Sequence, residues 1–384
     1  MDSENTPSVL RDSEFTEDGY VKTDSGILVP AYAAGERGFQ MGDTEKLNEF
    51  YDRLREEAHM FALCPFDACG EQIGPEHFNK ERPYGKVLKS WREFNRNVGK
   101  INYGDLMPNS KLMVAVGKNR QLDVGVAAEI AYYAEKLKRP IAAIKTDRRL
   151  EISPFIRHYL GDGPSEGAIF SGDNPIDDAM QALDGDDLSW TQSERKEKPD
   201  WNLTGEFKDN GMIRFEGNDF FPMLVLSDAG YDLEDREELN GYCEEFLSNG
   251  IFPLWTFRHE RFGVVEGDNI SDEYGKLDPY IFREELAPRS LFALSLLDGS
   301  HTKDPEVCAE IASYSVSQGK PIIGVGSDIR LADNVETPVN PAVGWFFWSD
   351  KFPDSKLFVD PQESYERGFR EIQKIADRIR SSRM

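Results

Sequence analysis

The sequence is poor in cysteine and in basic residues, and it contains no long apolar run. Four cysteines among 384 residues are too few for a disulfide framework, so we expect a protein of the reducing cytoplasm. No run approaches the roughly 18–20 apolar residues that a membrane helix needs. The segment Met1 to Tyr20 is acidic and polar, unlike a signal peptide. Lys and Arg number 45 against 70 Asp and Glu, and this net charge of −25 argues against nucleic acid or an anionic membrane as the main partner.

The remaining composition is that of a globular protein. Hydrophobic residues make up 39% of the chain, which is too much for a disordered one. At about 150 residues per domain, the length predicts two or three domains. The excess of acid also suits a halophilic protein, a hypothesis that folding and activity in low-salt buffer would contradict.

The chain repeats itself. Asp123–Tyr133 matches Asp304–Tyr314 at an offset of 181 residues, because both read as an acid-initiated helix with Glu at its seventh position. The register continues from Arg139-Pro140-Ile141 to Lys320-Pro321-Ile322. We therefore predict two copies of one domain, at 26–183 and 214–384, with an acidic N-terminal extension at 1–25 and a linker at 184–213.

Each copy has the pattern of alternating strands and helices. The predicted strands are 27–32, 61–66, 112–116, 141–144 and 168–170 in the first copy, and 223–226, 252–257, 291–297, 322–325 and 356–359 in the second. Helices are predicted from Asp43 and Asp232, over 124–137 and 307–317, and at the end of each copy over 175–183 and 362–379. This order predicts an α/β fold with a parallel sheet covered on both faces.

Acidic residues gather where a ligand would bind in such a sheet. Asp123 stands where the loop after the third strand enters the next helix, and Glu129 lies about two turns in, on an apolar face. Ligands of open α/β sheets bind beyond the carboxyl ends of the strands, and a carboxylate on an apolar face is costly unless it is paired or used. A capping Asp123 and a Glu129 whose tip reaches solvent are the structural alternatives. The second copy keeps an acid at the positions of Asp105, Asp123 and Glu129, namely Glu285, Asp304 and Glu310.

Such a set of carboxylates suits double displacement at an anomeric carbon. One ionised carboxylate attacks the carbon, a second acid protonates the leaving group, and a third orients the sugar. This chemistry needs no cofactor. The five histidines and four cysteines show no metal-ligand spacing, so no metal is expected.

The motifs resemble the nucleoside 2-deoxyribosyltransferase family. Asp-x-Gly-x-x-x-Glu at Asp123–Glu129 is followed by a basic residue, Pro and Ile, and then by Asp-x-Arg. The second copy adds Leu297-Asp298-Gly299 and Val339-Asn340-Pro341. The resemblance implies two tandem flavodoxin-like, Rossmann-like domains with parallel sheets, which cleave the N-glycosidic bond of deoxynucleosides. The sugar passes to another base, or to water in the hydrolase branch.

The resemblance also implies roles for individual residues. Glu129 and Glu310 match the family's nucleophile, and Asp123, Asp304 and Asp105 match its other catalytic acids. Asn340 matches an asparagine that reaches into a neighbouring subunit's site. The other implied substrate contacts are Gly125, Glu285, Asp298 and Tyr32, with Tyr231 as a counterpart of Tyr32.

The two copies differ from the family pattern to different degrees. Glu285 stands where the family has Asp, Glu306 where it has Gly, and the first copy has no counterpart of Asn340. We therefore hypothesise an intramolecular pseudo-dimer in which Asn340 completes the site of Glu129, while the site of Glu310 is weak or inactive. A homo-oligomer of such chains is the further possibility.

The predicted function is transfer of a 2-deoxyribosyl group between bases. A hydrolase of nucleosides or nucleoside 5′-monophosphates and a non-catalytic nucleotide-binding module are the alternatives. In each case the predicted partner is a small nucleoside or nucleotide.

Overall fold

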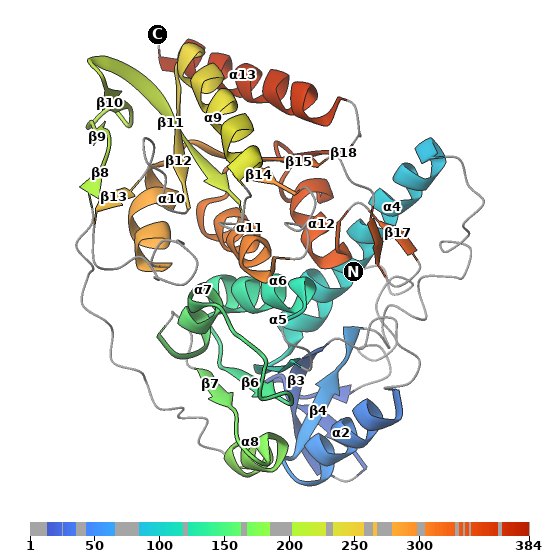
Figure 1. Ribbon diagram of the computed structural model, residues 1–384. Helices are drawn as coiled ribbons and strands as arrows, with labels where there is room; N and C mark the ends of the chain where they lie inside the picture. The colour runs from blue at the N-terminus through green and yellow to red at the C-terminus, as the bar shows by residue number, and fades with distance from the viewer. Residues whose placement is uncertain are drawn as a thin grey trace. The chain divides into compact units, whose positions relative to one another are not determined.

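A computed structural model describes most of the chain. The described residues are 14–24, 26–35, 44–65, 84–117, 122–162, 167–184, 202–227, 233–256, 264–266, 279–297, 304–326, 330–332, 335–337, 339–359 and 363–383. The chain divides into two compact units (Figure 1). Unit 1 comprises Met1–Arg195 with Arg330–Trp345, and unit 2 comprises Lys196–Ile329 with Phe346–Met384.

Unit 1 is built on a mixed sheet of seven strands. The strands are β1 (Glu14–Phe15), β2 (Val21–Thr23), β3 (Gly26–Gly35), β4 (Met60–Leu63), β5 (Leu112–Gly117), β6 (Ile141–Lys145) and β7 (Gly167–Phe170). Five of them are parallel in the order β4-β3-β5-β6-β7. In sequence order this is 2-1-3-4-5, the doubly wound order of flavodoxin-like sheets. The predicted α/β class is confirmed, with the difference that an antiparallel hairpin extends the sheet.

The helices of unit 1 cover both faces of this sheet. They are α2 (Thr44–Glu56), α4 (Tyr84–Gly99), π-helix η5 (Lys100–Leu106), α5 (Met107–Asn109), α6 (Val124–Tyr132), π-helix η6 (Tyr133–Leu137), α7 (Pro154–Arg157), π-helix η7 (His158–Asp162) and α8 (Pro175–Leu183). In Figure 1, α2 and α8 lie on one side of the sheet and α6 and α7 on the other. The stretch 84–109 before β5, which no periodicity predicted, is helical and carries one of the predicted acids, Asp105.

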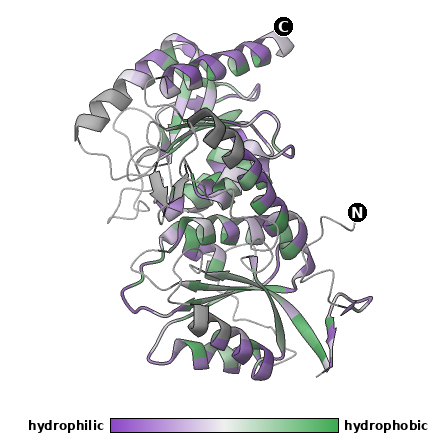
Figure 2. Cartoon of the chain, turned by 90° about the vertical axis from the view of Figure 1, so that its right-hand side faces the viewer, coloured by the Kyte–Doolittle hydropathy of each residue, from purple (hydrophilic) through white to green (hydrophobic). Residues whose placement is uncertain are grey.

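Alternation along β3 decides which face each side chain meets. Ala31 belongs to the core cluster that Phe50 and Leu54 of α2 form with Ala179 and Met180 of α8. Successive side chains of a strand point to opposite faces, so Tyr32 points to the face that α6 covers. The central strands of this sheet are largely hydrophobic (Figure 2).

Unit 2 repeats the topology. Its strands are β9 (Glu206–Phe207), β10 (Ile213–Phe215), β11 (Asn218–Leu226), β12 (Ile251–Trp255), β14 (Phe292–Leu296), β15 (Ile322–Gly326) and β18 (Lys356–Val359). The parallel order β12-β11-β14-β15-β18 is again 2-1-3-4-5. The helices are α9 (Leu233–Ser248), π-helix η8 (Ile281–Leu286), α10 (Ala287–Arg289), α11 (Pro305–Gln318) and α13 (Ser364–Arg383), with α12 (Pro341–Trp348) crossing the boundary between the units. Two small pairs complete the list: β8 (Asn202–Leu203) with β13 (Val264–Glu266), and β16 (Arg330–Ala332) with β17 (Val335–Thr337).

Stacked aromatic rings hold α9 and α13 together. Phe246 of α9 and Phe369 of α13 have ring centroids 4.4 Å apart with parallel planes, and Tyr242 stacks on Tyr365 at 5.4 Å. Offset and stacked aromatic pairs contribute about 0.5–1.5 kcal/mol each beyond their buried area. The long C-terminal helix is therefore fixed to unit 2 by its apolar face.

The repeat extends further upstream than the motifs indicated. Residues 14–23 were placed in the N-terminal extension and 206–213 in the linker, but both form hairpins of the two sheets. Phe15 pairs with Val21 in unit 1, and Phe207 pairs with Ile213 in unit 2. The turns of the two hairpins contain Gly19 and Gly211, with φ of 77° and 75°. All these positions are 192 residues apart, so the duplicated domain begins with this hairpin.

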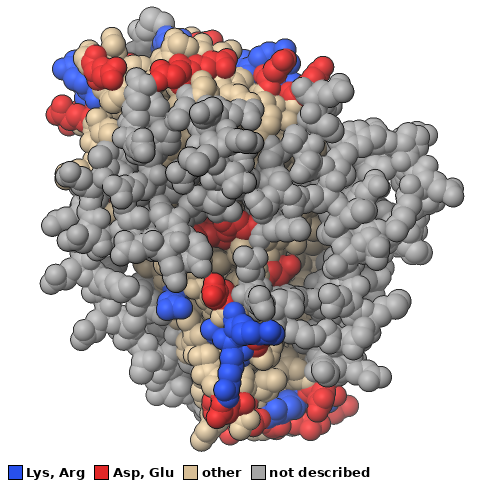
Figure 3. All heavy atoms as spheres, viewed as in Figure 1, with Lys and Arg blue, Asp and Glu red and all other residues tan. Residues whose placement is uncertain are grey.

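Ion pairs tie the outer helices of unit 1 to each other. Arg53 of α2 bonds Asp177 of α8 at 2.8 Å and Glu57 at 2.8 Å. Acidic and basic side chains lie next to one another on this part of the face shown in Figure 3. Exposed pairs of this kind stabilise a fold by about 0–1 kcal/mol each, so the buried apolar cluster carries most of the stability.

Candidate functional site

Helix α6 begins with a side-chain cap. Asp123 Oδ1 accepts hydrogen bonds from the backbone amides of Gly125, at 2.8 Å, and Val126, at 3.2 Å. Such a cap satisfies amides that the helix leaves without partners. The structural alternative for Asp123 is thus observed, and its carboxylate is fixed at the start of the helix that carries Glu129.

Glu129 does not reach solvent. Its side chain is buried, with 6% of the residue exposed, and Asn102 Nδ2 donates to Glu129 Oε1 at 2.9 Å. Burial raises the pKa of Glu129 to about 8, and the nearby charge of Asp123 raises it further. The hydrogen bonds from Tyr32 and Asn102 act in the opposite direction and lower the pKa. Desolvation disfavours the charged form of a carboxyl. Glu129 therefore holds a proton at neutral pH until its surroundings change, as a poised acid or nucleophile does.

One sequence-predicted residue joins this glutamate from another element, and a second lies on the π-helix that carries Asn102. Tyr32, fully buried on β3, reaches it across the sheet face. Asp105 lies on η5 three residues after Asn102, with its Oδ2 buried. The wide turn of a π-helix is often found at functional sites, and here it brings Asn102 onto the glutamate.

Asn102 is the residue that the sequence analysis missed. It lies between two apolar neighbours, Ile101 and Tyr103, in a stretch without a strong motif. The available signal was the comparison of the copies, because the second copy has Phe282 at this position. A polar residue in one copy and a phenyl ring in the other marks a position whose role differs between them.

Asn340 lies beside the start of α6. Its segment, 330–345, groups with unit 1 although it follows β15 of unit 2 in the chain. Asn340 Oδ1 accepts from the amide of Ala342 at 2.9 Å. A Cβ atom on Gly125 would lie 2.9 Å from both Asn340 Oδ1 and Asp123 Oδ1. A side chain at position 125 would thus crowd both the Asn340 amide and the Asp123 carboxylate, and glycine leaves this space open.

The segment of Asn340 is seated on the helix that carries Asn102. The Tyr103 hydroxyl donates to the carbonyl of Ala342 at 3.1 Å, and the rings of Tyr103 and Trp345 stack with centroids 6.2 Å apart. A Cβ atom on Gly99 would lie 2.6 Å from the Trp345 side chain. Trp345 therefore packs in a buried position.

The glutamate of unit 2 has different neighbours. Glu310 is buried on α11, which Asp304 caps through the amide of Glu306 at 2.7 Å, and Thr256 Oγ1 donates to Glu310 Oε2 at 3.4 Å. In the matching sheet registers, Leu224 of β11 takes the place of Tyr32. Phe282 takes the place of Asn102. Neither donor of the Glu129 site is therefore repeated at Glu310.

Contacts of the scaffold, by contrast, occur in both units. Ser110 bonds Tyr133 and Ser290 bonds Tyr314, each at 2.9 Å between hydroxyl oxygens. Arg139 donates to the carbonyl of Ser110, and Lys320 does the same to Ser290. The copies thus keep the polar contacts that support the fold and differ in those that surround the glutamate.

Of the remaining predicted residues, some lie in the described part of the chain and others do not. Glu285 of η8 forms an ion pair with Arg289 of α10 at 2.8 Å. In the Asp-x-Arg motif of unit 1, Arg149 pairs with Asp147 at 2.8 Å. Asp298 and Tyr231 lie outside the described residues, as do the predicted helix starts Asp43 and Asp232.

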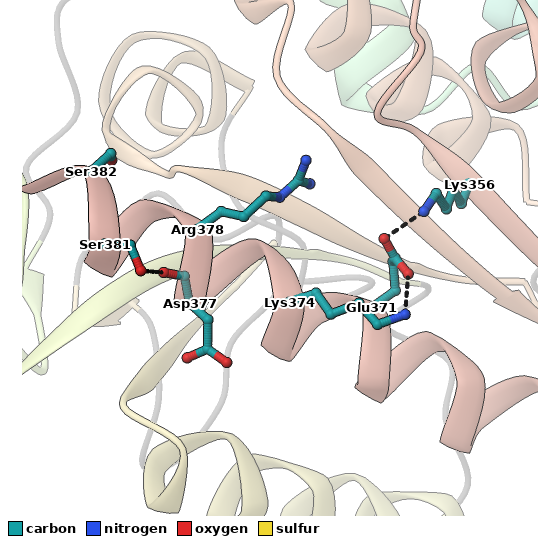
Figure 4. A pocket seen from close by; sticks show the side chains of 7 residues that line it. All are labelled: Lys356, Glu371, Lys374, Asp377, Arg378, Ser381 and Ser382. Carbon is teal, nitrogen blue, oxygen red and sulfur yellow. Dashed lines mark hydrogen bonds and ion pairs between the residues drawn. The ribbon is translucent and has the colours of Figure 1, made fainter.

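An open hollow of about 850 Å³ lies along α13 of unit 2 (Figure 4). Its lining comprises Lys356, Glu371, Lys374, Asp377, Arg378, Ser381 and Ser382. Glu371 bonds both lysines, so the charges of the hollow are largely matched. It has none of the buried carboxyl chemistry of the Glu129 site.

Two further features are absent from the described part of the chain. No group of three or more His, Cys, Asp and Glu side chains there is arranged to hold a metal ion. No helix in the same residues is both long and apolar enough to cross a membrane.

Comparison with known proteins leaves the family open. No protein-family model matches the chain, and no curated protein matches it. Among solved structures, the chain is similar to the glycosyltransferase SnogD from Streptomyces nogalater, with 11% identity over 92% of this chain and 94% of that one. The TM-score is 0.23, and a likeness of that size carries no argument about fold or function.

Proposed function

We propose that this protein cleaves the N-glycosidic bond of a nucleoside and transfers the sugar to another base, with Glu129 as nucleophile. The observation that supports this most is the buried Glu129, which is held by Asn102 and Tyr32 on the helix that follows β5. The resemblance to the deoxyribosyltransferase family makes a 2-deoxyribosyl group the expected sugar. The same grounds make the protein an enzyme of the glycosyltransferase type.

The reaction follows from the carboxylate. The ionised Glu129 attacks C1′ of the sugar as the C1′–N bond breaks, and the bonding electron pair leaves with the base, which takes a proton from an acid of the site. Asp123 and Asp105 are the acids of unit 1 proposed to supply that proton and to orient the sugar. A second base then attacks C1′ through a ring nitrogen and gives up its proton, and Glu129 leaves as carboxylate.

The burial of Glu129 favours transfer over hydrolysis. A glycosyl ester at a carboxyl that solvent scarcely reaches is protected from water until the acceptor base arrives. A hydrolase, including one acting on 5′-monophosphates, would instead admit water to the same ester. The raised pKa of Glu129 predicts that kcat/KM rises with pH up to about 8 and levels above it, because the ionised form attacks.

Unit 2 is proposed to be non-catalytic. Its Glu310 lacks counterparts of Tyr32 and Asn102, and Glu306 stands where unit 1 has Gly125. Glu306 has the Cβ atom that Gly125 lacks, and its side chain occupies the space beside the capping Asp304.

The test compares two matched variants. Wild type, Glu129→Gln and Glu310→Gln are incubated with deoxynucleosides, ribonucleosides and their monophosphates, with and without a second base, at low and high salt. We expect exchanged nucleoside from the wild type, a loss of about a thousandfold or more for Glu129→Gln, and little change for Glu310→Gln. Equal losses would refute the single site, and release of free base and sugar alone would identify a hydrolase. Absence of turnover from the whole panel would leave the binding module as the better hypothesis.

A further inference from the structure

The side chain of Asn102 uses only its amide nitrogen in hydrogen bonding. Its Nδ2 donates to Glu129 Oε1 at 2.9 Å. The residue is 3% exposed, and its Oδ1 is buried without a hydrogen-bond partner among the described residues. A buried acceptor without a donor destabilises a fold, and native structures contain few of them. An acceptor kept in this state beside a reactive carboxyl points to a donor that arrives with the substrate.

The position of Asn102 restricts what that donor is. Asn102 holds Oε1, and we assign to Oε2 the bond to C1′. When a carboxylate attacks an anomeric carbon, the substituent on the adjacent sugar carbon lies next to the carboxyl, and its hydroxyl forms hydrogen bonds that strengthen in the transition state. In a nucleoside this substituent is the 2′-hydroxyl of ribose. The Oδ1 atom of Asn102 is an acceptor only, which suits a hydroxyl donor.

The fold itself does not require an amide at this position. Unit 2 builds the same π-helical turn, η8, with buried Phe282 in the place of Asn102. An apolar side chain there satisfies packing and leaves no orphaned acceptor. The amide of unit 1 is therefore explained by the site and not by the architecture.

We propose that Asn102 is a positioning and sugar-specificity residue, which orients Glu129 through Nδ2 and accepts a hydrogen bond from the 2′-hydroxyl of a ribonucleoside through Oδ1. This proposal rests on the reaction proposed for Glu129 and changes its expected sugar, because it gives preference to ribonucleosides over the deoxynucleosides that the family resemblance implies.

The test measures sugar preference in wild type, Asn102→Ala and Asn102→Leu, the second of which fills the same space without polar atoms. Asn95→Ala is the matched control, since Asn95 is also buried on the preceding helix with an amide that has no hydrogen-bond partner among the described residues. We expect a ribose preference in the wild type and a fall of about 5- to 10-fold in the ratio of kcat/KM for ribonucleoside to that for the deoxynucleoside of the same base in both Asn102 variants. Asn95→Ala is expected to keep the wild-type ratio.

Equal losses with both sugars, or the same change in Asn95→Ala, would overturn the sugar contact. A second readout concerns the Asn102–Glu129 bond alone: infrared titration of the Glu129 carboxyl, identified by its absence in Glu129→Gln. The pKa of Glu129 is expected to rise in both Asn102 variants, and an unchanged pKa in folded protein would overturn the positioning role.

Binding separates this proposal from the proposed reaction. Calorimetry on Glu129→Gln, with and without Asn102→Ala, measures affinity for the two nucleosides without turnover. Tighter binding of the ribonucleoside that Asn102→Ala abolishes would support the sugar contact even if the wild type proved inactive. Equal affinity for both sugars in Glu129→Gln would overturn it even in an active enzyme.

Discussion

Replacing Glu129 by Gln is expected to stabilise unit 1 at neutral and alkaline pH. The pKa of Glu129 is raised by burial from its ordinary value of 4.5 to about 8. A carboxyl whose pKa is raised on folding stabilises the fold below its unfolded-state pKa, and this stability is lost as pH rises through the folded-state pKa. The wild type therefore loses stability between pH 4.5 and 8, whereas the Gln variant has no proton to lose.

The size of the effect follows from the two pKa values. At about 1.4 kcal/mol per pKa unit, the advantage of Glu129→Gln is near zero at pH 4.5, about 3 kcal/mol at pH 7 and at most about 5 kcal/mol above pH 8. The amide of Gln still offers an oxygen to Asn102 Nδ2, so the neutral contact is kept. The net charge of −25 changes the stability of both proteins with pH, but this shared background largely cancels in their difference.

Hydrogen exchange of the β5 and β6 amides measures this difference in unit 1 itself, because these central strands exchange through large-scale unfolding. Glu57→Gln is the control of opposite sign. The hydrogen bond from Arg53 lowers the pKa of the exposed Glu57. Glu57→Gln removes this ion pair and is therefore expected to weaken the fold by a small amount at pH values above 4.5. A Glu129→Gln protein that is less stable than the wild type at pH 8, or whose advantage does not grow with pH, would refute the argument.

Four glycines give further predictions. Gly125→Ala places a Cβ atom 2.9 Å from Asn340 Oδ1 and Asp123 Oδ1, and we expect about a hundredfold loss of kcat/KM. Unchanged turnover in the nucleoside assay would show that the space beside Gly125 is not part of the site. Gly99→Ala collides with the buried Trp345 at 2.6 Å and is expected to lower the unfolding free energy of unit 1 by about 1–3 kcal/mol, as denaturant titration with tryptophan fluorescence would show. Gly211→Ala strains a turn with φ of 75° and is expected to destabilise unit 2 by about 1 kcal/mol, whereas Gly241→Ala on an open face of α9 is expected to stabilise it by a similar amount; equal effects of these two changes would contradict the turn argument.

The sequence predicts the repeated core of the fold because strand and helix patterns are local. The parallel strands and the helices α6, α8 and α11 lie within a few residues of their predicted bounds. The hairpins were missed because their strands are two or three residues long and lie in charged segments, where periodicity carries little signal. Gly19 and Gly211 mark the two hairpins as equivalent, but only because both have a positive φ, which is a property of the backbone and not of the sequence pattern.

The site was predictable in its acids and, through the family resemblance, in Tyr32, but not in Asn102. Asp123 and Glu129 were found because spacing along one helix is a local property. Asn102 and Tyr32 reach Glu129 from a helix and a strand that are remote in the sequence, and the π-helical turn that presents Asn102 has no sequence signature of its own. The location of Asn340 beside Gly125 likewise depends on the grouping of the segment 330–345 with unit 1, a tertiary fact.

The most direct test of the account is mass spectrometry of the protein quenched during turnover of a nucleoside. A covalent sugar ester is expected on the peptide that contains Glu129, absent from Glu129→Gln and absent from the peptide that contains Glu310. Turnover without any sugar adduct under conditions that trap such esters, or an adduct on Glu310 alone, would contradict the claim that Glu129 is the nucleophile.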